Sequence, residues 1–442
     1  MLNDLKNILA SIKMTDVHLW LGRLIIWSAA IITGLVIVLF ARATEYAIAW
    51  FDQMQSALWW LPLIVMPVVG IFIVWATKRW FAGAAGSGIP QTMAALSYAE
   101  HQPIGHLVSI KIAVSKMGLV ILGLAAGFSA GREGPSVQVG ASIMHAFRRF
   151  LPQTFQIDPK HLILAGGAAG ISAAFNTPLA GIIFAIEELS RKFEQRTNGV
   201  MISAIVLSGL VSISLQGNYT YFGSLRVSPI DTQILLPVLI GGLVCGVFGG
   251  IFSKTLIELT ENLPGRITRL RTRHPLYWTG FCALLVAGLG IVSHGAANGS
   301  GYSLTKAMLN GSINETWYYP VVKYLSTIFT YLSGIPGGIF APALSIGAGI
   351  GYDLASIFHY HHLTIAFSAL CMAGFLAGVT QAPITSFIIV MEMIDGHEMV
   401  ISLMAVSLIA TVTSRIFSRP LYSVLAGQFT AGPPDQKRLD HP

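Results

Sequence analysis

Long apolar stretches separated by short polar segments run through almost the whole chain. An α-helix needs roughly 20 apolar residues to cross a bilayer. The stretches that approach or exceed this length are 24–40, 59–77, 162–186, 234–252, 277–293, 364–391 and 399–414. Other apolar stretches are shorter or are interrupted by glycine and proline. We therefore expect about ten or more helices, several of them too short to span the bilayer alone.

The composition places these helices in a membrane. Of 442 residues, 54% are hydrophobic and only 11% are charged, whereas soluble domains carry about 25% charged residues. The mixed, polar residues 1–20 predict a surface helix, and they lack the apolar core of a cleavable signal peptide. The chain is therefore predicted to be an all-α integral membrane protein.

Basic residues gather in the polar segments, and the formal net charge is +7. The clusters are Lys78-Arg79, Arg148-Arg149, Arg191-Lys192 with Arg196, and Arg266, Arg269, Arg271 and Arg273. Such clusters are typical of cytoplasmic loops, so they do not indicate a nucleic-acid partner. Lysine and arginine near both termini predict that the termini are also cytoplasmic. The weakly charged segment 217–233 is expected to face outward.

Cysteine and histidine give no sign of a metal site. Cys245, Cys282 and Cys371 are scattered through apolar segments, and we interpret them as small buried hydrophobic residues. The 12 histidines show no metal-ligand spacing. We expect neither a metal nor a cofactor.

The two halves of the chain carry matching motifs in the same order. Gly86-Ser87-Gly88 returns as Gly299-Ser300-Gly301, Gly131-Arg132-Glu133-Gly134-Pro135 as Gly338-Ile339-Phe340-Ala341-Pro342, and Asn176-Thr177-Pro178-Leu179 as Gln381-Ala382-Pro383-Ile384. Lys116 and Lys323 precede the second motif of each half at equal spacing, and Glu187 and Glu392 follow the third. Three matches in register predict an internal repeat.

Repeats of this kind are typical of transporters built from two related halves. We place the halves at about 20–216 and 233–425, within one membrane domain at 1–430 that is followed by a short polar tail at 431–442. An odd number of crossings inverts one half against the other. In such folds the substrate site lies near the middle of the membrane, at the ends of broken helices.

Glu133 is the only acid between Met117 and Phe147. A charged side chain at the bilayer centre costs about 2.5–3.5 kcal/mol, so such residues are normally functional. The surrounding glycines and Pro135 interrupt the helix and free backbone amides that can bind an anion. We predict that Glu133 occupies an anion site when ionised and leaves it when protonated. The alternative is a structural ion pair with Arg132.

Two further segments predict helix starts that face the same anion. In Gly86-Ser87-Gly88-Ile89-Pro90, Ser87 is suited to cap the helix. Its hydroxyl and nearby amides are candidate ligands, although an ordinary glycine-rich turn explains the motif equally well. In 334–342 the candidates are the amides of Ile339 and Phe340, and the alternative is a flexible re-entrant loop. Helix N-termini attract anions because they carry roughly half a positive charge.

Two other candidates are weaker alone. Glu187-Glu188 ends an apolar run beside a basic cluster, and is either a solvated helix end or a proton acceptor at the cytoplasmic end of a proton route. Tyr422 offers a phenol to an anion, but by itself it is better explained as a tyrosine at the membrane interface. The sequence contains no phosphate-binding loop, nucleophile elbow or nucleic-acid module.

Together these motifs resemble the CLC family of chloride channels and chloride/proton exchangers. The resemblance covers about residues 20 to 425 and rests on the two glycine motifs of the first half, on Gly337-Gly338-Ile339-Phe340-Ala341-Pro342 and on Pro420-Leu421-Tyr422-Ser423. It implies an all-helical fold of tilted, unequal helices in two inverted halves. It also implies a homodimer in the lipid bilayer with a separate pore in each subunit.

The resemblance also implies roles for individual residues. Ser87, Tyr422 and the amides of Ile339 and Phe340 match the central chloride ligands. Glu133 matches the outer gating glutamate, and Glu188 matches the inner proton-transfer glutamate of the exchangers. Channels of the family usually have an apolar residue at the inner position, so Glu188 favours exchange.

The resemblance further narrows substrate and regulation. Relatives that favour nitrate tend to have proline in place of Ser87, and the fluoride exporters vary both glycine motifs, so the pattern implies chloride. Many relatives carry regulatory domains after the last helix, whereas this sequence ends about 20 residues past Tyr422. We therefore expect no nucleotide regulation through such domains, and a prokaryotic cell membrane.

The sequence thus predicts a secondary active chloride/proton antiporter. The main alternative is a passive, voltage-influenced chloride channel of the same fold. A third interpretation is an intramembrane enzyme that uses Glu133 as a general acid or base, but no nucleophile–base pair accompanies this residue.

Overall fold

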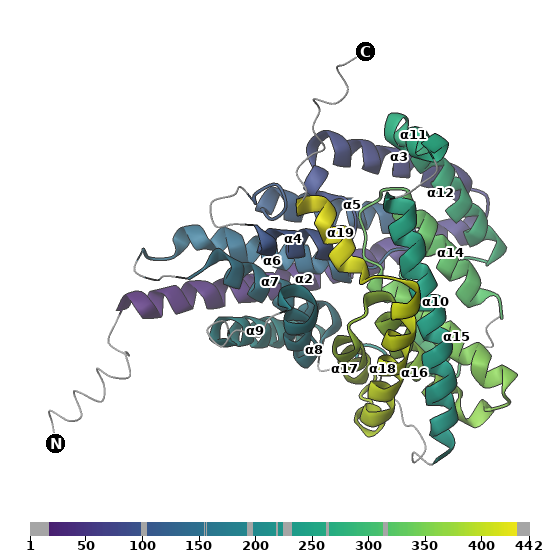
Figure 1. Ribbon diagram of the computed structural model, residues 1–442. Helices are drawn as coiled ribbons and strands as arrows, with labels where there is room; N and C mark the ends of the chain where they lie inside the picture. Colours follow the sequence, from purple (N-terminus) through teal and green to yellow (C-terminus); the bar gives the residue numbers. More distant parts are fainter. Residues whose placement is uncertain are drawn as a thin grey trace.

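A computed structural model shows a protein built from helices of very unequal length (Figure 1). It describes residues 17–98, 104–153, 155, 157–191, 198–217, 220–223, 232–261, 265–312 and 317–430. Within these ranges 8 helices are long and apolar enough to cross a membrane, which agrees with the predicted all-α membrane architecture. The expected surface helix at 1–20 falls outside the described residues, except for its last residues, which open the first long helix.

Long and short helices alternate in the first half. They are α2 (Val17–Ala57), α3 (Pro62–Trp80), α4 (Ile89–Ser97), α5 (Ile110–Ala125), α6 (Glu133–Phe147), α7 (Pro159–Phe175), α8 (Pro178–Phe184) and α9 (Asn198–Gln216). A π-helical turn, η3 (Ala185–Ser190), extends α8. The short helix α4 starts inside the protein, so its N-terminus is available to an internal site.

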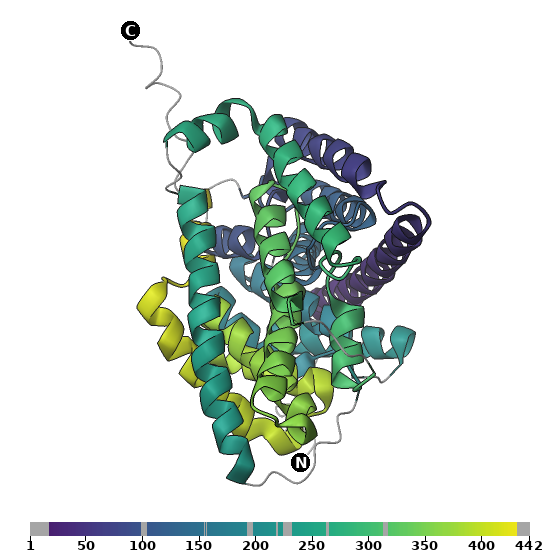
Figure 2. The same ribbon diagram turned by 90° about the vertical axis from the view of Figure 1, so that its right-hand side faces the viewer.

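The second half has a similar series. It comprises α10 (Leu235–Glu261), α11 (Gly265–Arg273), α12 (Pro275–Val292), α13 (Tyr302–Leu309), α14 (Tyr319–Leu332), α15 (Phe340–Ile357), α16 (Thr364–Thr380), α17 (Pro383–Ile394), α18 (Val400–Phe417) and α19 (Leu421–Thr430). Within the described ranges the 3-10 turns are η1 (Ala82–Ala84), η2 (Arg148–Phe150), η5 (Thr232–Ile234), η6 (His361–Leu363) and η7 (His397–Met399). Figure 2 shows the long α10 along one side of the molecule.

Close backbone contacts hold α10, α16 and α18 together. A Cβ atom added to Gly249 of α10 would lie 2.9 Å from the carbonyl carbon of Gly378 on α16, and one added to Gly250 would lie 3.1 Å from Ser414 of α18. Small residues at such positions allow membrane helices to pack closely. This packing gives the second half a rigid base for the site.

Two of the predicted spans are broken in the middle. The stretch 162–186 divides at Asn176 (φ 59) into α7 and α8, and the stretch 364–391 divides at Gln381 (φ 59) into α16 and α17. In each case a proline two residues later starts the next helix. Apolar length alone does not reveal these breaks, because the apolar pattern continues through a turn that redirects the backbone.

The two halves exchange helix caps. The Glu187 carboxylate accepts hydrogen bonds from the amides of Ile384 (3.1 Å) and Thr385 (2.6 Å) at the start of α17. In return, Glu392 accepts hydrogen bonds from Leu179 (3.1 Å) and Ala180 (2.7 Å) at the start of α8. This reciprocal contact relates the halves by an approximate twofold axis, as the repeated motifs predict.

Candidate anion and proton site

Three glycine-rich loops meet at the centre of the protein. Gly131 and Gly338 exchange two backbone hydrogen bonds, each 2.7 Å long, and the Gly337 amide donates to the Gly86 carbonyl oxygen (3.1 Å). These bonds fix the starts of α4, α6 and α15 next to one another. The helix α19 packs against α4, so Tyr422 in its first turn joins the same region.

Ser87 lies in the loop before α4 but does not cap the helix. The N-cap is Gly88, whose φ of 110° requires glycine, and its amide donates to the Gln91 side chain (2.9 Å). The predicted capping role of Ser87 was therefore wrong. Its hydroxyl is buried and has no hydrogen-bond partner among the described residues. An unpaired buried hydroxyl costs free energy unless a ligand satisfies it.

The Lys116 side chain binds the backbone of the loop before α4. Its ammonium donates to the carbonyl oxygens of Ala84 (2.9 Å), Ala85 (3.4 Å) and Gly86 (2.5 Å). Because the C=O and N–H of a peptide point in opposite directions, these bonds draw negative carbonyl ends away from Ser87. The sequence marked Lys116 only as part of the repeat, although a lone lysine in an apolar stretch is itself a functional signal.

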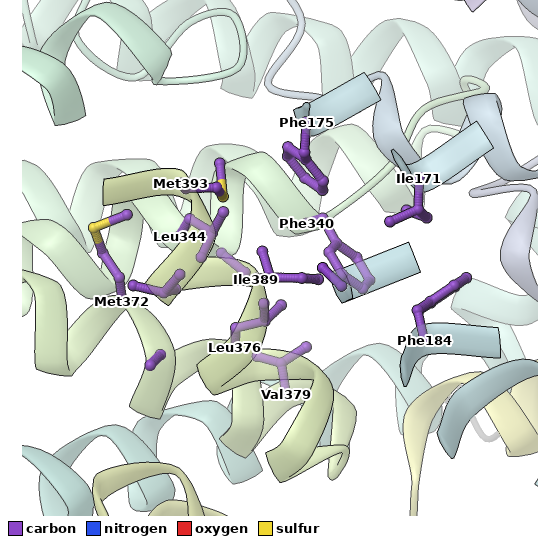
Figure 3. Packing of buried hydrophobic residues seen from close by; sticks show 14 of the residues in the cluster. Ile171, Phe175, Phe184, Phe340, Leu344, Met372, Leu376, Val379, Ile389 and Met393 are labelled. Carbon is purple, nitrogen blue, oxygen red and sulfur yellow. The ribbon is translucent and has the colours of Figure 1, made fainter. Parts of the chain in front are cut away.

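The start of α15 presents free amides to the same point. Ile339 is the N-cap and Phe340 the first helical residue, and neither amide donates a backbone hydrogen bond within the described ranges. The Phe340 ring stacks on Tyr422 with a centroid distance of 6.0 Å and meets the Phe184 ring edge-on at 6.1 Å. Figure 3 shows Phe340 among Phe184, Phe175 and other apolar side chains.

Tyr422 is fully buried, which contradicts its interpretation as an interface tyrosine. Its phenol lies near the Ser87 hydroxyl, but neither oxygen makes a hydrogen bond of normal geometry with any residue that the structure describes. Two hydroxyls and the amides of Ile339 and Phe340 thus converge without partners. This set of donors fits a small anion.

Glu133 is completely buried at the start of α6, and neither carboxylate oxygen has a hydrogen-bond partner of normal geometry in the described ranges. The nearest amides belong to Arg132, Glu133 itself and Ala341. The alternative of an ion pair with Arg132 is not formed, because the Arg132 guanidinium instead binds Glu45 of α2 (2.8 Å). An acid therefore faces the same helix starts that the hydroxyls face.

Two cavities approach this group of residues. The first, here named the Glu133 cavity, has a volume of about 290 Å³ and reaches Glu133 between α2 and α13. The second, the Ser87 cavity, has a volume of about 180 Å³ and reaches Ser87 between α4, α11 and α19. They share no lining residue. Tyr422 and Phe340 line neither cavity and are fully buried, so they close the path between the two cavities at the centre of the protein.

Glu188 stands apart from the anion ligands, in the π-helical turn η3. Its side chain is 2% exposed, and its nearest charged partner is Arg191 at 3.7 Å. A π-helical turn shifts side-chain directions, so Glu187 caps α17 while Glu188 points into the protein. Of the two earlier interpretations, a solvated helix end is excluded for Glu188. Tyr422 is within electrostatic range of both Glu188 and Glu133.

Fold and site together define a multi-pass membrane protein of two inverted repeats, with unpaired donors and one acid at the starts of broken helices. A sequence model described as voltage gated chloride channel matches residues 69–415. The chain belongs to this family, the CLC family, as its motifs indicated.

Similar proteins and solved structures agree with this family assignment. The H(+)/Cl(-) exchange transporter ClcA of Salmonella arizonae is 31% identical over 90% of this chain and 87% of its own length, and that of Citrobacter koseri is 31% identical over 91% and 88%. The structure of a slow cyanobacterial Cl-/H+ antiporter matches with a TM-score of 0.79 at 23% identity, covering 94% of this chain and 98% of that one. A CLC-type fluoride/proton antiporter matches with a TM-score of 0.76 at 23% identity, covering 92% and 97%. These two structures establish the fold.

Proposed function

We propose that the protein is a secondary active chloride/proton antiporter. The observation that carries this proposal is the fully buried, unpaired Glu133 carboxylate beside free helix-start amides and the unpaired hydroxyls of Ser87 and Tyr422. The name of the relatives at 31% identity, H(+)/Cl(-) exchange transporter, supports it.

Competition between two anions explains the exchange. Chloride binds the Ser87 and Tyr422 hydroxyls and the amides of Ile339 and Phe340, where partial positive charges replace its hydration shell. The ionised Glu133 carboxylate is held by the adjoining amides of Arg132, Glu133 and Ala341, so its negative charge keeps chloride from the same helix starts. Protonation neutralises it, weakens its hold on those amides and clears the path for chloride. Each passage of the anion is thereby linked to gain or loss of a proton.

The proton leaves or arrives through Glu188. Phe184 lies one helical turn before Glu188, and its ring contacts Phe340, so apolar side chains separate Glu188 from Glu133. A proton crosses such a gap on transient water molecules. Glu188 lines neither the Ser87 cavity nor the Glu133 cavity, which supports a separate route for chloride. The anion and proton routes therefore share Glu133 and then separate.

Orientation and assembly are part of the same proposal. The basic segments between helices favour cytoplasmic termini and a cell membrane of bacterial type, and the family resemblance favours a homodimer with one pore per subunit. Light scattering of the detergent-solubilised protein tests the dimer, with a monomer mass as the contradicting result. Accessibility of a cysteine introduced at Ser303, beside the Glu133 cavity, to an impermeant reagent in intact cells tests the orientation.

A liposome experiment tests the exchange itself. Purified full-length protein is reconstituted, a chloride gradient is imposed without a pH gradient, and external pH is recorded. Antiport predicts that chloride moving down its gradient drives protons uphill in the opposite direction. Chloride flux with no proton movement would establish the passive channel instead. If folded, dimeric protein carries no anion flux at all, both the antiporter and the channel are refuted.

A further inference from the structure

The second half of the chain contains a counterpart of the loop that carries Ser87. Lys323 donates to the carbonyl oxygens of Ala297 (3.2 Å), Asn298 (3.0 Å) and Gly299 (2.8 Å), just as Lys116 holds the carbonyls before α4. The helix α13 follows, with Gly301 as its N-cap at φ 82 and no side-chain cap. Carbonyls again point to a buried lysine, which leaves the first amides of α13 directed elsewhere.

The residues that carry those amides lie beside the Glu133 cavity. Ser300, Gly301, Tyr302, Ser303 and Leu304 all line it. The Tyr302 amide is occupied by a weak hydrogen bond to the Ser300 hydroxyl (3.3 Å). The amides of Ser303 and Leu304 have no backbone acceptor among the described residues. A helix start with free amides attracts negative charge.

A cation lines the same cavity. Arg132 is 6% exposed, and its Nε has no hydrogen-bond partner within the described part of the chain. Its Nη1 alone makes the contacts with α2, to Ala41, Thr44 and Glu45. The largely buried Arg132 side chain lines the Glu133 cavity, and its positive charge is an independent sign that this cavity accommodates an anion.

We propose a second anion site in the Glu133 cavity, between the start of α13 and Arg132, that holds a halide before it reaches Glu133. The ligand class rests on the proposed chloride transport, whereas the site itself rests on α13, Arg132 and the cavity. It is separate from the central group of Ser87 and Tyr422, with which the cavity shares no lining residue.

The charges around the cavity link this site to the proton. Glu45 is paired with Arg132 at 2.8 Å, and Asp52 lies in the field of Lys323. Lys306, at 3.4 Å from the Tyr302 hydroxyl, adds a positive charge behind α13. The remaining ionisable groups that line the cavity are Tyr221, Tyr302 and Glu133. A halide at the start of α13 is repelled by ionised Glu133 as well as by Asp52, so a bound halide favours protonated Glu133, and the reverse holds by linkage.

Bromide offers a direct test, because its anomalous scattering locates it in crystals of the full-length protein. We expect density at the start of α13 in addition to density beside Ser87. In Ser303→Glu the first should disappear and the second remain, since a carboxylate in the first turn takes the amides and also suits the helix. Ser303 is exposed, so the fold tolerates the change.

The two failures are distinguishable. Density beside Ser87 with none at α13, in crystals of the wild-type protein, overturns this inference and leaves the proposed function intact. Density at neither place, at a bromide concentration that saturates flux, counts against the central site and thus against the proposed function. Density at α13 that persists in Ser303→Glu also overturns the inference, because the ion then does not depend on those amides.

Transport gives a second readout. In liposomes Ser303→Glu should raise the chloride concentration for half-maximal flux by about threefold to tenfold on one side of the membrane only. Gln53→Glu adds the same charge at an exposed position of α2 that does not line the cavity, and it should match the wild type. Equal shifts in Ser303→Glu and Gln53→Glu would show a general surface-charge effect and overturn the site.

Discussion

At Glu133 the competition between a carboxylate and chloride sets the pH dependence of transport. Acid pH neutralises the carboxylate, so chloride flux should rise as pH falls. Glu133→Ala removes the competitor, and its flux should be independent of pH with no proton coupling. Fluxes of both ions in liposomes across a pH series measure this. The exposed Glu398 provides a control, since Glu398→Ala should keep the wild-type profile. Proton pumping that survives in Glu133→Ala would refute the assigned role.

Glu188 and Glu187 are neighbours with different predicted effects on coupling. Glu188 is buried without a hydrogen bond to Oε1 from any described residue, whereas both Glu187 oxygens accept amide hydrogen bonds at the start of α17. Glu188→Gln should therefore lose proton transport and keep chloride flux, and Glu187→Gln should keep both. The ratio of proton flux to chloride flux in liposomes, measured for each variant, tests this prediction. The opposite pattern would make Glu187 the proton acceptor.

For single residues, burial in the structure distinguishes between alternative roles that the sequence left open. Tyr422 alone resembled an interface tyrosine, and only the packing of α19 on α4 buries its phenol beside Ser87. The sequence also assigned the cap of α4 to Ser87, because serine is a good N-cap. It could not show that Gln91 takes the Gly88 amide and that the serine hydroxyl is thereby left unpaired.

At the scale of elements, the exchanged caps should contribute to stability. Removing a side-chain cap costs about 0.5–2 kcal/mol. In Glu187→Gln and Glu392→Gln an NH₂ group replaces one of the two acceptor oxygens, so each variant should lower the free energy of unfolding by up to this amount. The repeat predicts similar losses for both. Denaturant unfolding in detergent, followed by tryptophan fluorescence, measures them. Glu398→Gln should stay within about 0.5 kcal/mol of the wild type. A loss in only one variant would show that the caps are not equivalent.

The elements also show what the sequence could and could not predict. Matching motifs at equal spacing predicted the repeat, and the structure shows its consequence in the cross-contacts of Glu187 and Glu392. The breaks at Asn176 and Gln381 escaped the analysis of apolar stretches, since hydrophobicity reports burial in lipid or protein but not backbone direction. The role of Glu45 as the partner of Arg132 was also missed, because the two residues lie 87 positions apart.

For the whole molecule, the direction of the two ions determines the response to voltage. Chloride leaving a compartment and a proton entering it both carry positive charge inward. Exchange therefore moves net charge in every cycle, and each elementary charge is worth about 2.3 kcal/mol per 100 mV. An inside-negative potential should drive chloride out and protons in, and an inside-positive potential should reverse both.

Proteoliposomes with a potassium gradient and valinomycin provide the measurement, since potential can be set without changing the chloride or proton gradient. The wild type should acidify its interior at inside-negative potential, and Glu188→Gln should move chloride under the same potential without acidification. A rate that does not change when the potential is reversed would mean an electroneutral cycle. Because Glu133 and Glu188 lie at separate points of the buried interior, part of the charge movement belongs to the proton route, and voltage sensitivity should therefore be smaller in Glu188→Gln than in the wild type.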